Sequence, residues 1–296
     1  LIRISERANF ALRSLYQPQS LALRPRSDGV SFSGQGLAAG DTFTVPVGIW
    51  GSGSYTDAEA DGDDAPFDTK RYAFLGGVDV SLLENVLLGL AVGFDRTDTD
   101  TNFNRGEQTT DGFTFAPYFA ARFLEHWSVD FSIGYSALDI DQFRLAPTTD
   151  ERINSDLDAK RWFFSGNANY QRIFGNWILS GRTGITWARD DYDDFVESDG
   201  TRVEEDSLQL GQVRVGAEVA YAWGQFEPFI SGTYENDYKR SRANVSNAID
   251  DTGGVIGFGL RFFGGNGISG TLEYNTVIGR DDYDEDSINF LFRAEF

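Results

Sequence analysis

The sequence lacks cysteine altogether, and it has only one histidine and no long apolar run. Without cysteine there are no disulfides and no thiolate metal sites, although this absence alone says nothing about the compartment. The mean hydropathy is negative, and no window approaches the roughly 18 to 20 consecutive apolar residues that a membrane-spanning helix requires. These absences exclude a membrane protein built of helices.

The beginning of the chain also lacks two features of a complete precursor. Leu1 stands where an initiator methionine would be, and the residues after it do not form a basic, apolar leader with a small-residue cleavage site. We therefore expect a processed or truncated product.

What the sequence does have is a clear alternation at its end. From residue 287 to 296, apolar side chains occupy one parity and polar ones the other, with Leu291 as the exception. A strand has a period of two, so this segment predicts a strand with one apolar and one wet face. An amphipathic strand that ends the chain on an aromatic residue resembles the assembly signal of bacterial outer-membrane β-barrels, which the barrel-assembly machinery reads. The residues that carry this resemblance are Ile288, Phe290, Phe292 and Phe296.

The composition suits a barrel in a membrane. In hydrocarbon every backbone amide must be paired within the protein, so the spanning structure other than a helix is a closed barrel. Its hydropathy signal is weak because the positions that face the lumen stay polar. The 33 glycines and 25 phenylalanines fit many twisted strands with aromatic rims. A soluble, acidic all-β domain is the alternative, because its strands alternate in the same way.

Tight and long connections follow one another along the chain. The tight ones consist of turn-forming residues at 83–85, 124–126, 175–176, 224–225 and 264–267. The long ones span 55–69, 95–110, 139–157, 189–207, 236–251 and 280–287. Short periplasmic turns and longer extracellular loops are typical of outer-membrane barrels. The pattern predicts an all-β fold, a twelve-stranded antiparallel transmembrane β-barrel over residues 45–296, with both of its ends periplasmic and its long acidic loops extracellular.

The strand faces predict what touches lipid. One parity of each strand is apolar, as in the segment 86–94. Aromatic residues beside the tight turns predict a belt at the periplasmic interface, formed by Phe123, Trp127, Phe174, Trp177 and Phe226. Pro117 lies in the middle of the segment 113–123 and predicts a bulge or a local break, because proline cannot donate to a ladder.

The opposite parity predicts the lining of the lumen, and it is densely charged. Its ionisable residues are Asp79, Asp130, Arg182, Arg214, Glu218, Glu227, Glu235, Arg261, Glu273, Arg293 and Glu295. Charges at this density cannot face lipid. They either form a network of charge pairs that fills the interior or line a selective pore, and the sequence leaves both readings open.

Residues 1–44 differ in charge from the rest. They carry five arginines against three carboxylates, a net charge of +2, so that the remainder carries −23 of the total of −21. Ser5 is a candidate cap for a short helix over residues 6–16, and a glycine- and serine-rich linker follows. We hypothesise that residues 1–28 plug the lumen, with Arg3, Arg7 and Arg13 facing its carboxylates. A disordered periplasmic tail is the alternative.

Several segments together resemble the autotransporter β-domain family. They are the glycine-rich opening at 48–55, the segment 76–79, the strand 88–94, and the terminal aromatic residue. The resemblance covers residues 45–296 and implies a barrel that anchors and helps translocate an N-terminal passenger, with a linker helix in the pore. The sequence contains no passenger, so a small porin-like or structural outer-membrane protein stays open as the alternative, as does surface adhesion through the acidic loops.

The remaining features favour no catalysis and no cofactor. Barrel enzymes of the outer membrane use a histidine in their extracellular half, whereas His126 falls in a tight turn at the predicted periplasmic end. The acidic runs at 189–194 and 280–285 have carboxylates of the kind that hold Ca²⁺ or Mg²⁺, but they lack the spacing of a defined calcium loop. The expected partners are outer-membrane lipids and lipopolysaccharide, the barrel-assembly machinery and a passenger. Nucleic acid is not expected beside so negative a surface.

Overall fold

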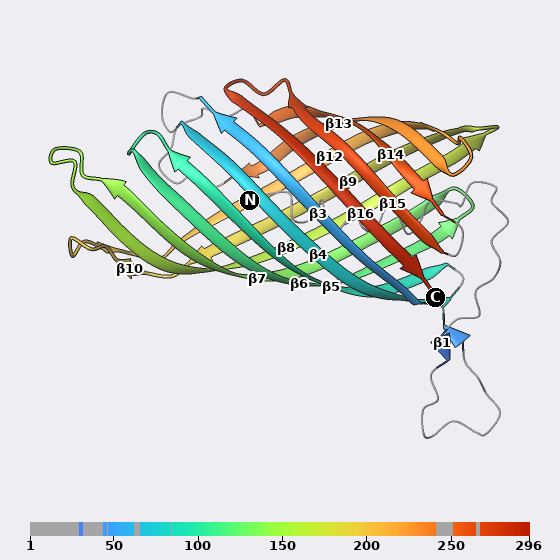
Figure 1. Ribbon diagram of the computed structural model, residues 1–296, viewed down its shortest axis with the longest axis horizontal. Coiled ribbons are helices and arrows are strands. Elements are labelled where there is room, and N and C mark those ends of the chain that lie inside the picture. Colours follow the sequence, from blue (N-terminus) through green and yellow to red (C-terminus); the bar gives the residue numbers. More distant parts are fainter. Residues whose placement is uncertain are drawn as a thin grey trace.

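The computed structural model shows one large sheet rolled into a barrel (Figure 1). It describes residues 30–31, 44–45, 47–61, 66–83, 85–240, 251–264 and 267–296. The helix predicted over residues 6–16 and the proposed plug arginines Arg3, Arg7 and Arg13 lie outside these ranges. No helix of the described part is long and apolar enough to cross a membrane.

The barrel is closed, and its strands are antiparallel. Each strand pairs with its neighbours along the chain, and the last strand pairs with the first. In the described residues the barrel strands are β3 (Val47–Ala60), β4 (Phe67–Leu83), β5 (Val86–Thr101), β6 (Gly106–Leu124), β7 (Trp127–Leu145), β8 (Arg152–Phe174), β9 (Trp177–Tyr192), β12 (Asp206–Tyr221), β13 (Phe226–Arg240), β14 (Thr252–Phe263), β15 (Ile268–Ile278) and β16 (Tyr283–Glu295). This is the predicted fold class with the predicted number of barrel strands.

Two small ladders stand outside the barrel. β1 (Val30–Ser31) pairs with β2 (Thr44–Val45), and β10 (Phe195–Val196) pairs with β11 (Arg202–Val203) within the connection between β9 and β12. The β10–β11 hairpin lies at the end of the barrel opposite to the C-terminus (Figure 1).

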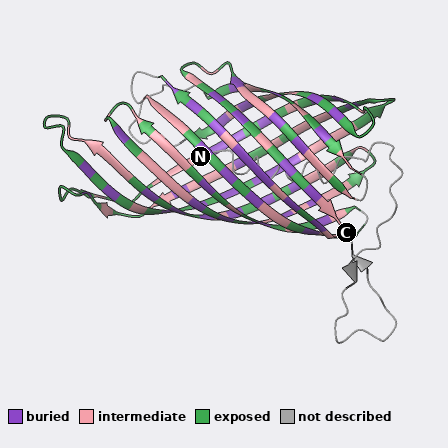
Figure 2. Ribbon diagram, viewed as in Figure 1, coloured by how far each residue is buried: buried purple, intermediate pink, exposed green. Residues whose placement is uncertain are grey.

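The burial of the side chains alternates along much of the barrel wall and forms stripes across neighbouring strands (Figure 2). In β16, Phe290 and Phe292 are 47% and 52% exposed, whereas Leu291 between them is 3% exposed. The apolar parity therefore faces outward and the polar parity inward, the reverse of a soluble protein. Leu291, the apolar residue on the wet side, packs inside against Trp50 and Leu75.

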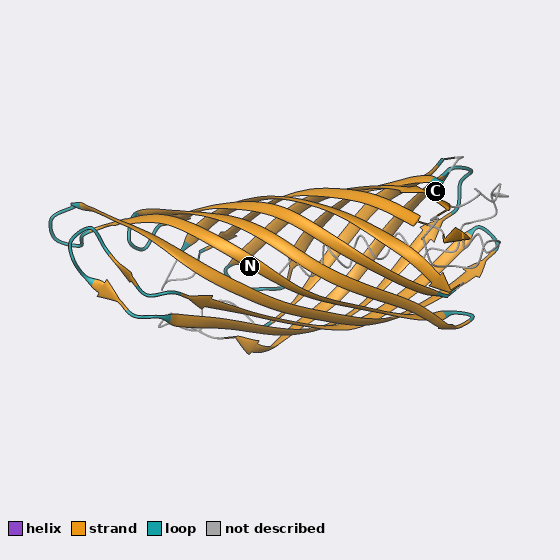
Figure 3. Cartoon of the chain, turned by 90° about the horizontal axis from the view of Figure 1, so that it is seen from below, coloured by secondary structure: helices purple, strands orange, loops and turns teal. Residues whose placement is uncertain are grey.

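The long connections predicted at one end are mostly strand. The connection predicted at 95–110 is only residues 102–105, because β5 runs to Thr101 and β6 begins at Gly106. The connection predicted at 139–157 shrinks in the same way to 146–151. The prediction of long loops was wrong because charged residues stood on both parities there. A strand that projects into water needs no apolar face, so the ladder continues beyond the apolar zone. Figure 3 shows the strands running on until short loops connect them.

The projecting strands give the barrel an uneven rim. β8 has 23 residues and β15 has 11, while about 9–11 residues suffice to cross a bilayer. The wall formed by β7 and β8 therefore extends well beyond the wall formed by β14 and β15.

Aromatic side chains form belts at both edges of the apolar zone. The five residues predicted beside the tight turns are exposed there, and ring pairs such as Trp127–Tyr170, at 5.1 Å, extend this belt. A second belt, absent from the sequence prediction, lies toward the other end, where Tyr55 pairs with Tyr72 at 5.1 Å and Tyr135 with Trp162 at 5.0 Å. Belts of this kind mark the two interfaces of a membrane.

Pro117 produces a break without a bulge. β6 pairs with β7 on both sides of residues 116–117 in the same register, and those two residues have no partner in β7. On the other side, Pro117 stays opposite Leu90 of β5.

Candidate functional site

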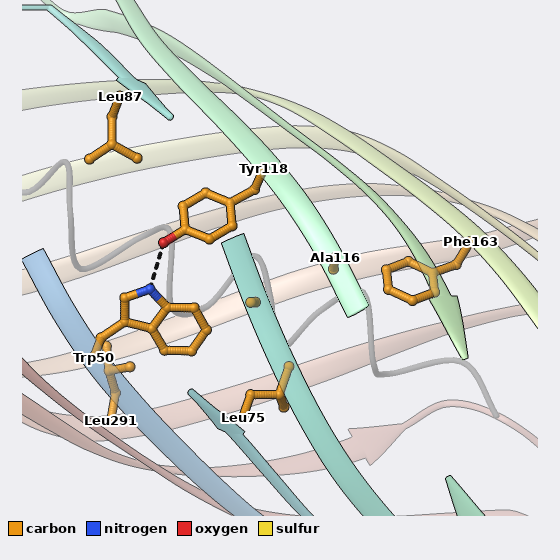
Figure 4. Packing of buried hydrophobic residues seen from close by; sticks show 8 residues of the cluster. Trp50, Leu75, Leu87, Ala116, Tyr118, Phe163 and Leu291 are labelled. Carbon is orange, nitrogen blue, oxygen red and sulfur yellow. Dashed lines mark hydrogen bonds between the residues drawn. The ribbon is translucent and has the colours of Figure 1, made fainter. Parts of the chain in front are cut away.

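The inner wall near the tight turns is held by a network that crosses four strands. Arg293 of β16 donates from Nη1 and Nη2 to the two carboxylate oxygens of Asp79 in β4, each at 2.8 Å. The hydroxyl of Tyr118 in β6 donates to Asp79 at 2.9 Å and accepts from the indole nitrogen of Trp50 in β3 at 2.6 Å (Figure 4). The network thus joins the closing strand β16 to β4, and charge-assisted pairs of this geometry are the strong ones.

The two rings of this network require glycine beneath them. A Cβ at Gly89 would lie 2.1 Å from the Tyr118 ring, and one at Gly77 would lie 2.3 Å from the Trp50 ring. These glycines allow the aromatic side chains to lie flat along the inner wall, as aromatic side chains commonly do over glycine in sheets.

A second cluster at the same end centres on Arg261 of β14. Its Nη1 donates to Glu227 at 2.7 Å and its Nη2 to Glu218 at 2.6 Å. The guanidinium also stacks over Phe229, 3.9 Å from the ring centre. One arginine thereby bridges β12, β13 and β14 on the inside of the barrel.

Asp130 of β7 forms the third cluster. It accepts from the amide nitrogens of Asn167 and Asn169 at 2.6 and 2.8 Å, and Arg182 approaches it to 3.8 Å. Beside it lies an interior cavity of about 400 Å³, whose lining includes Arg122, Asp130, Arg182, Glu218 and Arg261. The interior is therefore polar and charged at this end, but it is not filled by the described side chains.

Further from the tight turns, the wall contains ion pairs that were missed in the sequence. Arg71 pairs with Asp95 at 2.6 Å, and Arg161 pairs with Asp190 at 2.6 Å, all four being buried. Asp95 and Asp190 were missed because they fall in segments that the sequence predicted as loops, and Arg71 and Arg161 were not among the predicted lumen charges. The available signal was parity, since Arg71 has the same inward parity as Asp79.

Arg280 makes a comparable contact at the far end. It reaches Asp237 at 3.1 Å and Glu235 at 3.5 Å. Of the predicted lumen charges, Asp79, Asp130, Arg214, Glu218, Glu227, Glu235, Arg261, Glu273 and Arg293 are buried. Arg182 and Glu295 are partly exposed, with 16% and 31% of their side-chain surface accessible. Nine of these eleven residues are therefore buried, and most of the eleven form ion pairs.

Outside the apolar zone, the β10–β11 hairpin is fastened to the projecting wall. Arg144 at the end of β7 donates to both oxygens of Glu197, at 2.9 and 2.6 Å. Within the hairpin, the backbone amide and hydroxyl of Thr201 hydrogen-bond to Asp199 and hold its pKa below the ordinary value. In the described residues no group of three or more acidic or histidine side chains is arranged to hold a metal ion.

The outward face of β16 carries the predicted assembly residues. Ile288, Phe290, Phe292 and Phe296 are all about half exposed, between 47% and 52%. The backbone of Phe296 exchanges hydrogen bonds with Val47 at 2.9 and 3.3 Å, where the barrel sequence begins. Both ends of the barrel sequence therefore meet at the tight-turn end.

An apolar outside between two aromatic belts, around a charged inside, defines a β-barrel that spans a membrane. The autotransporter β-domain profile matches residues 49–275, and the chain belongs to that family. It is an outer-membrane β-barrel of the autotransporter type.

Curated relatives are outer membrane proteins of Rickettsia. The chain is 28% identical over 142 residues to outer membrane protein B of Rickettsia japonica, and 27% identical over 169 residues to that of Rickettsia rickettsii. The matches cover 46% and 55% of this chain but only 8% and 9% of those proteins. The chain thus spans a small part of the length of these relatives.

Solved structures with a similar fold include autotransporter barrels. The translocator domain of NalP from Neisseria meningitidis superposes with a TM-score of 0.74 at 14% identity, covering 84% of this chain and 88% of that one. The β-domain of Bordetella BrkA gives 0.71 at 16% identity, covering 84% and 98%. At these identities the similarity concerns the fold.

Proposed function

We propose that this barrel anchors an N-terminal passenger in the bacterial outer membrane and helps it to cross to the cell surface. The observation that carries the proposal is the meeting of Val47 and Phe296 at the tight-turn end. Tight turns are periplasmic in outer-membrane barrels. Chain that precedes Val47 therefore starts from the periplasmic side, and its route to the surface passes the charged lumen.

The sidedness follows from the same argument. The projecting strands, the acidic connections and the β10–β11 hairpin are extracellular, and both ends of the barrel are periplasmic. The barrel-assembly machinery is the partner that inserts the chain, and it reads the outward residues of β16. Lipopolysaccharide and other outer-membrane lipids surround the apolar face.

We further propose the domain division 1–44 and 45–296, with residues 1–28 as the lumen plug. Charge supports the pairing of plug and wall. On the inner face of β12–β16 the carboxylates outnumber the arginines, and the N-terminal segment carries the net charge of +2. Single-channel recordings of the full chain and of a chain without residues 1–28 test the plug, because removal of a plug raises the conductance. Unchanged conductance would contradict the plug.

Catalysis is not part of the proposal. The histidine lies in the turn between β6 and β7, against the ring of Tyr170 at 5.9 Å. This position is at the end remote from the projecting strands, whereas the histidine of outer-membrane barrel enzymes lies in the extracellular half.

Surface display of a fused reporter tests translocation. A reporter domain placed before Leu1, behind a secretory leader, is expected to be shaved from intact cells by added protease. The matched control is the same fusion without residues 283–296, which cannot close the barrel and is expected to leave the reporter inside. A reporter that stays in the periplasm while the intact barrel is folded in the membrane would contradict the proposed function.

A further inference from the structure

The second aromatic belt, which lies toward the projecting strands, contains the same arrangement of side chains twice. Across β3, β4 and β5, Tyr55 is opposite Tyr72, which is opposite Arg96. Across β7, β8 and β9, Tyr135 is opposite Trp162, which is opposite Arg189. In both rows a tyrosine, a second aromatic residue and an arginine follow one another on the outer face.

The next outward row beyond each belt repeats as well. Lys70 stands two residues from Tyr72 and opposite Asp98, and Lys160 stands two residues from Trp162 and opposite Asp191. In each case the lysine and the arginine are diagonal neighbours on adjacent strands, about 7–8 Å apart at the backbone. We call Tyr55, Tyr72, Lys70 and Arg96 the first patch, and Tyr135, Trp162, Lys160 and Arg189 the second patch.

These patches are exceptions on an acidic outer face. On β3, β6 and β16, the first outward residue beyond the apolar zone is Asp57, Asp111 and Asp286, respectively. The whole chain has a net charge of −21. On this face, the two patches are therefore a specific feature. In each of them a lysine and an arginine stand side by side, next to aromatic rings.

The side chains of the patches are accessible. Arg96, Lys160 and Arg189 have 50%, 53% and 42% of their side-chain surface exposed. Each contacts carboxylates: Arg96 lies 3.4 Å from Asp98 and 3.5 Å from Asp111, Lys160 3.1 Å from Asp193 and Arg189 2.6 Å from Asp191. Asp57 is opposite Lys70, so acidic residues of the same face border the first patch. Exposed pairs of this kind are weak and exchange readily, so they hold the cations in place without preventing another anion from binding.

The position of the patches relative to the membrane identifies the anion. Tyrosine and tryptophan lie at the level of the headgroups, and lysine and arginine just beyond them reach lipid phosphates. Arginine binds a phosphate with two parallel hydrogen bonds, and lysine adds a point charge. We propose that each patch binds a phosphate group of a glycolipid in the outer leaflet, with its acyl chains against the aromatic rings. The inference rests on the proposed orientation, in which this end of the barrel is extracellular.

Lipid binding to the refolded full chain tests the patches. Native mass spectrometry of the chain in detergent, with added phosphorylated lipid A, is expected to show two tightly bound glycolipids. Dephosphorylated lipid A is expected to show neither. Equal binding of the two lipids by the wild-type chain would overturn the proposal without recourse to any variant.

Variants then assign the sites. The pair Lys70→Gln and Arg96→Gln is expected to remove one bound lipid A, the pair Lys160→Gln and Arg189→Gln the other, and all four together both. The control is Arg202→Gln, an arginine of β11 that is 72% exposed, pairs with Asp194 and lies outside either patch; this variant is expected to keep both lipids. Retention of both lipids by the fourfold variant would overturn the proposal.

The outcome is separable from that of the proposed function. Heat-modifiable mobility on gels shows independently whether the wild-type chain forms a barrel in detergent, and the reporter fusion shows whether it translocates. If the barrel folds and translocates the reporter but binds lipid A equally well without the four charges, the lipid proposal is wrong and the proposed function stands.

Discussion

Arg293 lies in β16, the strand that closes the barrel by pairing with β3. It joins β16 to β4 through Asp79, whose side chain is 1% exposed. Replacement by glutamine removes the cation and leaves the aspartate buried without it. We expect Arg293→Gln to lower the free energy of unfolding by about 3–5 kcal/mol, measured by urea titration of the refolded barrel.

Two further variants show whether this cost comes from the unpaired charge. Arg202→Gln removes a cation of an exposed pair and is expected to cost under about 1 kcal/mol. The double variant with Asp79→Asn removes both charges and is expected to lose less than Arg293→Gln alone. Equal costs for Arg293→Gln and Arg202→Gln would show that the Asp79 pair is not structural.

Gly89 is the glycine on which the Tyr118 ring depends. Alanine there places its Cβ 2.1 Å from that ring, so the ring must leave Asp79 and Trp50. We expect Gly89→Ala to cost about 1–3 kcal/mol in urea unfolding. Gly181→Ala is the matched control, because nothing lies within 4 Å of its Cβ position. A loss as large for Gly181→Ala would contradict the role of the Tyr118 ring, because an alanine at that position meets no neighbouring atom.

At the scale of single strands, β16 combines closure of the barrel with the terminal aromatic residue. If Phe296 is read by the assembly machinery, its deletion lowers the fraction of folded barrel in the outer membrane but leaves refolding into detergent unchanged. Phe123→Ala is the control, since Phe123 is an exposed aromatic residue of the same belt, at 54% against 48% for Phe296. Heat-modifiable mobility in cell membranes measures both, and equal losses would contradict a specific signal.

The strands also show where sequence reasoning succeeds and where it stops. Parity located Asp79, Glu227 and Arg293 on the inner face, because a period of two survives wherever one face meets lipid. It failed beyond the belts, where both faces meet water and Thr97 and Asp98 are equally acceptable on either side. The ladder there is specified by pairing with neighbouring strands, which a single segment does not reveal.

At the scale of the whole molecule, strand number and closure were predictable from turn chemistry. The uneven rim was not, since it depends on how far each pair of strands continues in water. The two patches were not either, because Tyr72 and Arg96 are 24 positions apart in the sequence and become neighbours only through register. Lys70 and Lys160 read as isolated charges until that register is known.

The central claim is that the barrel spans the outer membrane with its projecting strands outside. Because the chain has no cysteine, single cysteines report their own surroundings without background. Val196 in β10 is 63% exposed, Gln225 lies in a tight turn, and Phe290 is 47% exposed in the middle of the apolar zone.

The most direct test is labelling of Val196→Cys, Gln225→Cys and Phe290→Cys by a membrane-impermeant maleimide in cells. The account predicts labelling of position 196 in intact cells, of position 225 only after the outer membrane is permeabilised, and of position 290 only after the barrel is unfolded. Labelling of position 290 in the folded protein in intact membranes, or of position 225 before position 196, would contradict it.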